Sequence, residues 1–200
     1  MIALIPGFLT GLSLIVAIGA QNAFVIRQGL LRSHVLLVVA VCSLSDAFLI
    51  VLGTGGLGEI VKANEHLLTF IRWLGVAYLT WFGIRSLRSA FKENQLLASG
   101  AAETTWKKIL ATVLALTYLN PHVYLDTVIF VGSIANQFTT DRWYFAIGAS
   151  FASLAWFTSI GFGAQAASKL MSKPIFWRIF DTFVALVMFS IAFTLAIFKF

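Results

Sequence analysis

Six long apolar runs follow one another along the chain, separated by shorter polar connections. They lie at 4–26, 35–52, 67–84, 109–135, 143–167 and 179–198. A helix of about 20 apolar residues crosses the hydrocarbon core of a bilayer, so each run is long enough to span it. The pattern therefore predicts an all-α membrane protein in which residues 1–200 form a single transmembrane domain of six helices.

Composition excludes most soluble classes of protein. The chain is 60% hydrophobic and 11% charged, with a mean hydropathy of +0.92, whereas soluble domains average roughly 25% charged residues. The net charge of +6 comes from basic residues that flank apolar runs, so we expect membrane lipid rather than nucleic acid as the partner. The single cysteine, Cys42, allows no intrachain disulfide and builds no metal site alone.

Lys and Arg residues are unevenly divided between the two sides of the predicted spans. The connections after the first, third and fifth runs hold ten of them, and the opposite side holds three. Cytoplasmic loops carry an excess of Lys and Arg, so we place the linker 85–108 in the cytoplasm and both termini outside. The ten are Arg27, Arg32, Arg85, Arg88, Lys92, Lys107, Lys108, Lys169, Lys173 and Arg178, and the three are Lys62, Arg142 and Lys199.

Two similar polar motifs, at 21–25 and 119–123, interrupt the first and fourth runs. Three runs make up each half of the chain, and an odd number of spans forces the second half to insert in the opposite orientation. We therefore predict two inverted three-helix repeats, 1–84 and 109–200, as in many secondary transporters. Chance similarity between apolar sequences is the alternative.

Side-chain amides find no hydrogen-bond partner in hydrocarbon, so both motifs are expected to face protein, water or a ligand. Pro121 removes one helix hydrogen bond, which frees carbonyls near Asn120 and favours a broken helix over a simple kink. The predicted substrate-binding residues are Gln21, Asn22, Asn120, Pro121 and His122, near the centre of the membrane where the two halves meet.

Asp46 is the most informative single residue. It lies about 16 Å into the second run, near the bilayer centre, where a carboxylate costs on the order of 3 kcal/mol. It is therefore expected to bind the cation of a substrate, carry a proton or pair with a base. Arg72 lies at a similar depth in the third run, and we predict that the two pair in at least one conformational state. Outward snorkelling of Arg72 is the alternative.

Two further acidic residues lie in the apolar runs. Asp126 follows His122 by one helical turn, so the two can form a proton relay, although His122 can equally serve as a neutral hydrogen-bonding group. Asp181 begins the sixth run, where we expect it to pair with Arg178 or to meet water.

Several segments resemble the LysE family of amino-acid exporters, in the branch that contains LysE and ArgO. The likeness covers nearly the whole chain, and its segments are 18–29, 45–46, 72–79 and 119–126. Two residues depart from the family pattern. Ala20 stands where the family commonly has proline, and Asp181 stands where a neutral residue is expected.

The resemblance implies a secondary transporter of the bacterial inner membrane that exports L-lysine, L-arginine or both. Amides around Asn22 and Asn120 would hold the amino-acid backbone, and an acidic side chain would hold the ammonium or guanidinium. Exporting one positive charge costs about 2.3 kcal/mol per 100 mV. No nucleotide-binding motif is present, so we expect antiport with protons, with Asp46 or Asp126 alternating between substrate and proton, and no cofactor.

Other functions remain as alternatives. Export of neutral amino acids needs no acidic residue in the site. One Cys and three His without a close cluster count against a divalent metal as substrate. A membrane-embedded enzyme needs a nucleophile–base pair or a metal set, and the sequence shows neither, so we predict no catalytic residues. A structural subunit would not explain Asp46 and Asp126, and homo-oligomer formation stays open.

The predicted orientation can be tested with a thiol reagent that does not cross membranes. A cysteine introduced at Gln95, in a cysteine-free background, should be labelled only after cells are permeabilised, because the linker is predicted to face the cytoplasm. Labelling in intact cells would overturn this orientation.

Overall fold

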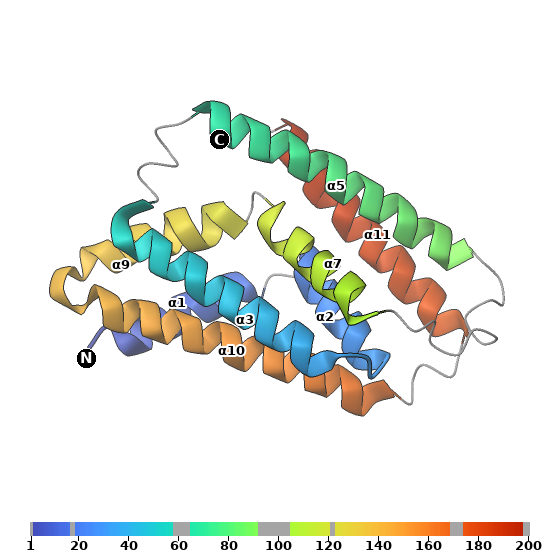
Figure 1. Cartoon of the computed structure of the whole chain (residues 1–200), viewed down its shortest axis with the longest axis horizontal. Helices are drawn as coiled ribbons and strands as arrows, with labels where there is room; N and C mark the ends of the chain where they lie inside the picture. Colours follow the sequence, from blue (N-terminus) through green and yellow to red (C-terminus); the bar gives the residue numbers. More distant parts are fainter. Residues whose placement is uncertain are drawn as a thin grey trace.

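The computed structural model describes residues 2–16, 19–57, 65–91, 105–120, 123–168 and 174–197. These residues form helices and no strand, which confirms the all-α prediction (Figure 1). In chain order the elements are α1 (Leu4–Ile15), α2 (Ala20–Leu30), α3 (Val35–Leu52), η1 (Gly53–Leu57), α5 (Glu65–Phe91), α7 (Trp106–Tyr118), η2 (Tyr124–Val131), α9 (Gly132–Gln137), η3 (Thr139–Asp141), α10 (Arg142–Ala166) and α11 (Pro174–Ile197).

Three stretches in the described part of the chain are long and apolar enough to cross a membrane. They are Val35–Leu57, Thr139–Ala166 and Ile175–Ile197, and α1 with α2 passes the same test as a pair bent by 82°. This supports a multi-pass membrane protein. The third and fourth predicted runs correspond to α5 and to the shorter α7, η2 and α9, so the count of six spans stays a prediction.

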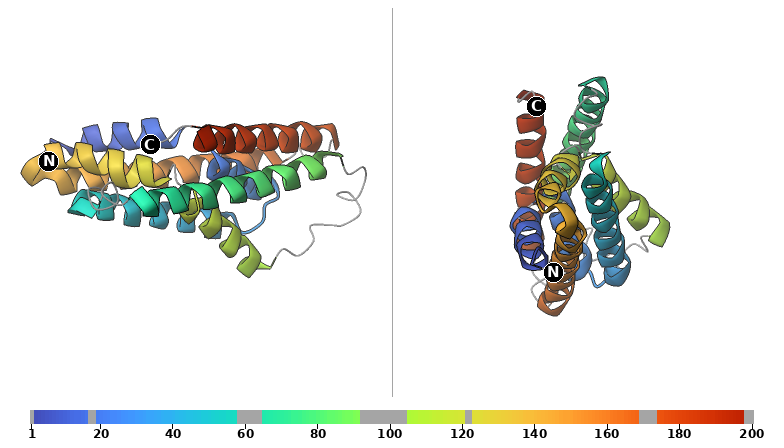
Figure 2. Two further views of the ribbon diagram at one scale, coloured as in Figure 1. Left: turned by 90° about the horizontal axis from the view of Figure 1, so that it is seen from above. Right: turned by 90° about the vertical axis from the view of Figure 1, so that its left-hand side faces the viewer.

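The helices pack as two groups. In one group α10 lies along α1 and also contacts α2 and α3, while α3 packs against α7 and η2. In the other, α5 lies along α11 at one edge of the molecule, as Figure 1 and the right-hand view of Figure 2 show. The main contact between the groups runs from α11 to α2.

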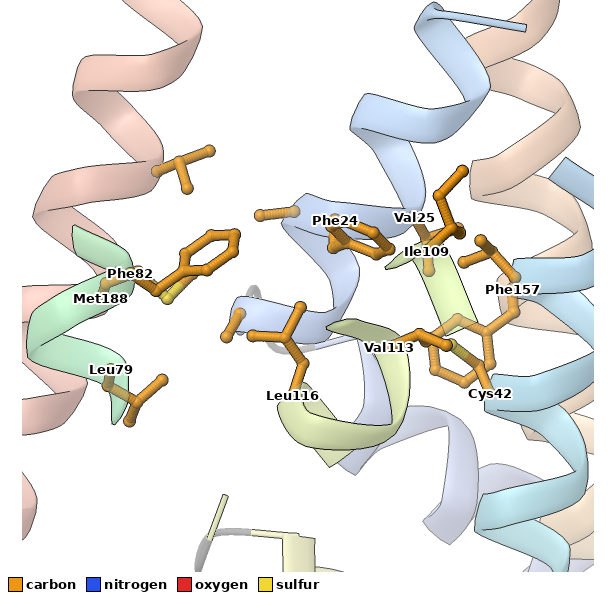
Figure 3. Close-up of a cluster of buried hydrophobic side chains, with 14 of the residues drawn as sticks. Phe24, Val25, Cys42, Leu79, Phe82, Ile109, Val113, Leu116, Phe157 and Met188 are labelled. Atoms are coloured by element: carbon orange, nitrogen blue, oxygen red, sulfur yellow. The ribbon is translucent and has the colours of Figure 1, made fainter. Parts of the chain in front are cut away.

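A buried apolar cluster fills the space between these groups. Figure 3 shows Leu79, Phe82 and Met188 on the side of α5 and α11, with Phe24 of α2 between them and the remaining helices. Side chains from α3, α7 and α10 complete the cluster on the other side. The labelled members there are Cys42, Ile109, Val113, Leu116 and Phe157.

Two of the predicted runs are broken helices. The first run splits into α1 and α2, and the break falls directly before Ala20 although no proline stands there. Gly19 has an extended backbone at this point, with φ −112° and ψ −178°. The fourth run splits into α7 and the segment that begins at Val123, as predicted from Pro121, although Pro121 and His122 themselves lie outside the described residues.

Basic residues of the described chain gather where several helices end together. Arg32, just beyond α2, donates from Nε to Ser168 Oγ at 2.8 Å beyond the end of α10. Arg178 near the start of α11 lies over the ring of Phe91 at the end of α5, 5.5 Å from its centroid. The helix ends predicted to share one side of the membrane are thus at one end of the molecule. Which side this end faces stays a prediction.

Glycine allows the close contact between α1 and α10. A Cβ on Gly148 would collide with the carbonyl of Leu4, and one on Gly7 would collide with the carbonyl of Phe145. Helices in a bilayer associate largely through such van der Waals contact between small residues. The contact matters for function because α1 and α10 both contribute to the cavity described below.

Gly148→Leu should therefore separate α1 from α10 and lower the melting temperature of the purified protein by several degrees, since overpacking costs about 1–3 kcal/mol. Gly163→Leu is the matched control, because a Cβ at Gly163 on the same helix meets no atom within 4 Å. Both can be measured as the fraction that stays monodisperse in detergent after heating. Equal losses in the two variants would contradict the packing argument.

Candidate functional site

A cavity of about 220 Å³ lies where the two helix breaks approach each other. Five of the predicted site residues lie in its wall: Gln21, Asn22, Asp46, Asn120 and Asp126. The remaining wall is mostly apolar, from Gly11, Leu14, Ile15, Gly19, Ala20, Ile50, Val123, Thr127, Val131, Phe157 and Ile191. Predicted site residues from both halves of the chain thus line the same cavity.

Asn22 joins the two parts of the first broken helix. A helix break leaves the last carbonyls of α1 without partners inside the helix. Asn22 Nδ2 donates to the Ile15 carbonyl at 2.8 Å, and its Oδ1 accepts from Trp156 Nε1 of α10 at 3.3 Å. Its amide therefore stabilises the break besides lining the cavity. Trp156 was not among the predicted site residues.

The second break has a comparable contact. The hydroxyl of Tyr124, in η2, donates to the carbonyl of Tyr118 at the end of α7, at 2.9 Å. The π-helical winding of η2 carries Asp126 into the cavity wall, and π-helical segments are frequent at functional sites. Sequence reasoning missed Tyr124, although it directly follows the motif at 119–123.

Asp46 lies in the cavity wall and is bonded to α10. Its side chain is 3% exposed, and Oδ2 accepts a hydrogen bond from Ser153 Oγ at 2.8 Å. Gln21 lies beside this carboxylate, where its side-chain amide can donate to it. Ser153 was not predicted, because no local pattern shows which polar residue of α10 faces α3.

Arg72 is placed differently from the prediction. It lies on α5, which packs along α11 rather than α3, and its guanidinium stands over the ring of Trp73 at 5.3 Å. Within the described residues the Asp46 carboxylate is bonded to Ser153 and not to Arg72. The predicted pair therefore stays a prediction for another conformational state.

The prediction for Asp181 was wrong. Its side chain is fully buried and does not meet water. Its Oδ1 pairs with Arg27 Nη1 of α2 at 2.9 Å, while Arg178 stands over Phe91. The cause is tertiary packing. Because α11 packs against α2, the buried face of α11 brings Asp181 next to Arg27.

The cavity presents opposite charges to a ligand. α2 begins at its wall with Ala20, and the free N–H groups of a helix N-terminus carry partial positive charge that favours a carboxylate. Asp46 and Asp126 supply negative charge for a cation. Within the residues described, no group of three or more His, Cys, Asp or Glu could hold a metal ion. The arrangement suits a small zwitterion with an additional positive charge.

Comparison with known proteins places the chain in a family. The model of the LysE type translocator family matches residues 12–199. The lysine exporter LysE of Corynebacterium diphtheriae is 41% identical over 92% of this chain and 94% of that protein. The arginine exporter ArgO of Pectobacterium carotovorum is 40% identical over 96% of this chain and 95% of that protein. No solved structure matches the chain. The chain therefore belongs to the LysE type translocator family, which confirms the resemblance in its sequence and the prediction of a transporter rather than an enzyme.

Proposed function

We propose that this protein exports L-lysine, L-arginine or both across the inner membrane of a bacterium. The observation that carries the proposal is the single cavity that joins Asp46, Asp126 and the N-terminus of α2. The relatives named as a lysine exporter and an arginine exporter support it, since each aligns over nearly its whole length.

The cavity suggests how such a substrate binds. The α-carboxylate lies at the start of α2, where the N–H groups of the first helical turn favour an anion beside Gln21 in the cavity wall. The ammonium or guanidinium lies against Asp46 and Asp126, because paired cation and carboxylate form the stronger hydrogen bonds. Asn120, followed in sequence by Pro121 and His122, completes the site from the second half of the chain.

Export is driven by proton entry in this proposal. A basic amino acid leaves against an inside-negative potential, and a returning proton offsets that cost. Asp46 lies in the cavity and is shielded from solvent, so one carboxyl group can exchange a cationic substrate for a proton. Asp126 is the second candidate, and Arg72 pairs with Asp46 in at least one other conformational state.

The fold in this proposal is a pair of inverted repeats, 1–84 and 109–200, joined by the cytoplasmic linker 85–108. Each half contains a broken helix followed by two further helices, in the order α1–α2, α3, α5 and α7–η2, α10, α11. The corresponding helices α5 and α11 pack on each other, as do α3 and α10. Both termini lie outside, and the cavity between the repeats is reached from alternate sides.

Vesicles containing the purified protein test substrate and coupling together. Radiolabelled arginine or lysine placed on one side should move faster when an opposing proton gradient is imposed, and collapse of the gradient should slow it. Transport that ignores the gradient would exclude proton coupling. Leucine or homoserine moving as fast as arginine would transfer the assignment to neutral amino acids.

Asp46→Asn should abolish export of basic amino acids, or reduce it at least tenfold, while the protein still inserts in the membrane. The change keeps the shape but removes the charge, and a hydrogen bond to a charged group contributes about 1.5–3 kcal/mol. Initial efflux rates per inserted protein give the measurement. Asp141→Asn, at the end of the molecule where α10 begins, is the control. Near-normal export by Asp46→Asn would leave Asp46 a structural residue.

A further inference from the structure

An ion pair joins the two helix groups at their main contact. Arg27 of α2 and Asp181 of α11 lie 2.9 Å apart, and their side chains are 25% and 1% exposed. A buried ion pair usually adds little stability over apolar residues of similar size, because both charges lose their hydration. A role in holding the helices together is therefore a weak explanation for its presence.

The pair lies between the cavity and the end of the molecule where basic residues gather. α2 begins at the cavity with Ala20 and reaches Arg27 after two turns, at about 1.5 Å of rise per residue. Beyond Arg27 the helix ends near Arg32. A substrate that follows α2 to the cavity from this end passes the carboxylate of Asp181.

The carboxylate of Asp181 has one buried hydrogen-bond acceptor without a donor. Oδ2 of Asp181 is buried and makes no hydrogen bond within the described residues. Buried acceptors without donors are unfavourable. Arg27 bonds to Oδ1 alone, whereas a substrate guanidinium or ammonium that approaches from the side of Oδ2 brings several N–H donors to the atom that Arg27 leaves unbonded.

The two partners differ in their freedom to separate. Arg27 is partly exposed and lies near the ring of Trp177, 5.9 Å from its centroid, so its guanidinium can move away without being stranded in apolar surroundings. Asp181 is enclosed and needs a cation beside it. The group that leaves is therefore Arg27, and the group that receives a new partner is Asp181.

We propose that Asp181 is a second cation-binding position on the route from the cytoplasm to the central cavity, and that Arg27 occupies it when no substrate is present. The guanidinium or ammonium of a basic substrate replaces Arg27, which frees α2 from α11 and opens the route. This inference rests on the proposed export of basic amino acids, and it adds a specificity-determining residue outside the cavity.

The test separates a binding position from a structural pair by neutralising both charges at once. Arg27→Gln with Asp181→Asn leaves no unpaired charge, so a merely structural pair predicts nearly unchanged transport. The proposal predicts that the KM for arginine, measured as uptake into inverted membrane vesicles, rises roughly tenfold, as expected for the loss of one charge-assisted hydrogen bond. The maximal rate should change by less than about twofold.

Two controls fix the interpretation. Citrulline has the shape of arginine without its charge, so its half-inhibitory concentration should not change in the double variant. Arg32→Gln removes a cation at the same end of the molecule, where the partner is Ser168 and not a carboxylate, and it should leave the KM for arginine unchanged. A comparable rise in Arg32→Gln would show a general charge effect and overturn the inference.

If the double variant fails to accumulate in the membrane, Asp181→Asn alone replaces it in the test. This variant leaves Arg27 without its carboxylate, but Arg27 is partly exposed and can be solvated by water. Its KM for arginine should rise to a similar extent. An unchanged KM in either inserted variant, with normal transport by the unmodified protein, would overturn the inference and leave the proposed function intact. If the unmodified protein moves neither arginine nor lysine, the proposed function fails, and this inference fails with it.

Discussion

Hydrocarbon supplies no hydrogen bonds, and this constraint shapes every irregular feature of the molecule. A helix can break at membrane depth only where other protein groups satisfy the backbone atoms that the break exposes. Asn22 does this for Ile15, and Tyr124 does it for Tyr118. Because both breaks open towards one space, Asn22 stabilises its own break and also places a polar side chain in the wall of that cavity.

Close helix packing depends on the same constraint. α1 ends at the cavity, so its position on α10 decides where Asn22 and the start of α2 lie. Gly7 and Gly148 permit that position. From α10 the side chains of Ser153 and Trp156 reach Asp46 of α3 and Asn22 of α2, so this one helix orients polar groups of two others. These polar groups are thus held by a helix that contributes only Phe157 to the cavity wall.

The sequence predicted the helical class, the break near Pro121 and the five polar residues that meet in the cavity. Polar residues such as Asp46 and Asn120 are easily recognised within apolar runs. Because burying them costs free energy, they are expected to bind a ligand or to pair with other polar groups. Ser153 and Trp156 were missed because hydrogen bonds across more than 100 residues depend on helix rotation. Asp181 was assigned to Arg178 for the same reason, since Arg178 is near in sequence whereas Arg27 is brought close only by packing.

Charge distinguishes two ends that an inverted repeat would otherwise make alike. Arg72 is the eighth residue of α5 and Asp181 is the eighth residue of α11. The contact of Arg178 with Phe91 makes these two helices antiparallel, so Arg72 and Asp181 lie towards opposite ends of the molecule. In the export that we propose, a cationic substrate would bind beside Asp181 at one end once Arg27 has moved away, and it would pass Arg72 towards the other end. The two ends would then differ in their affinity for a cation.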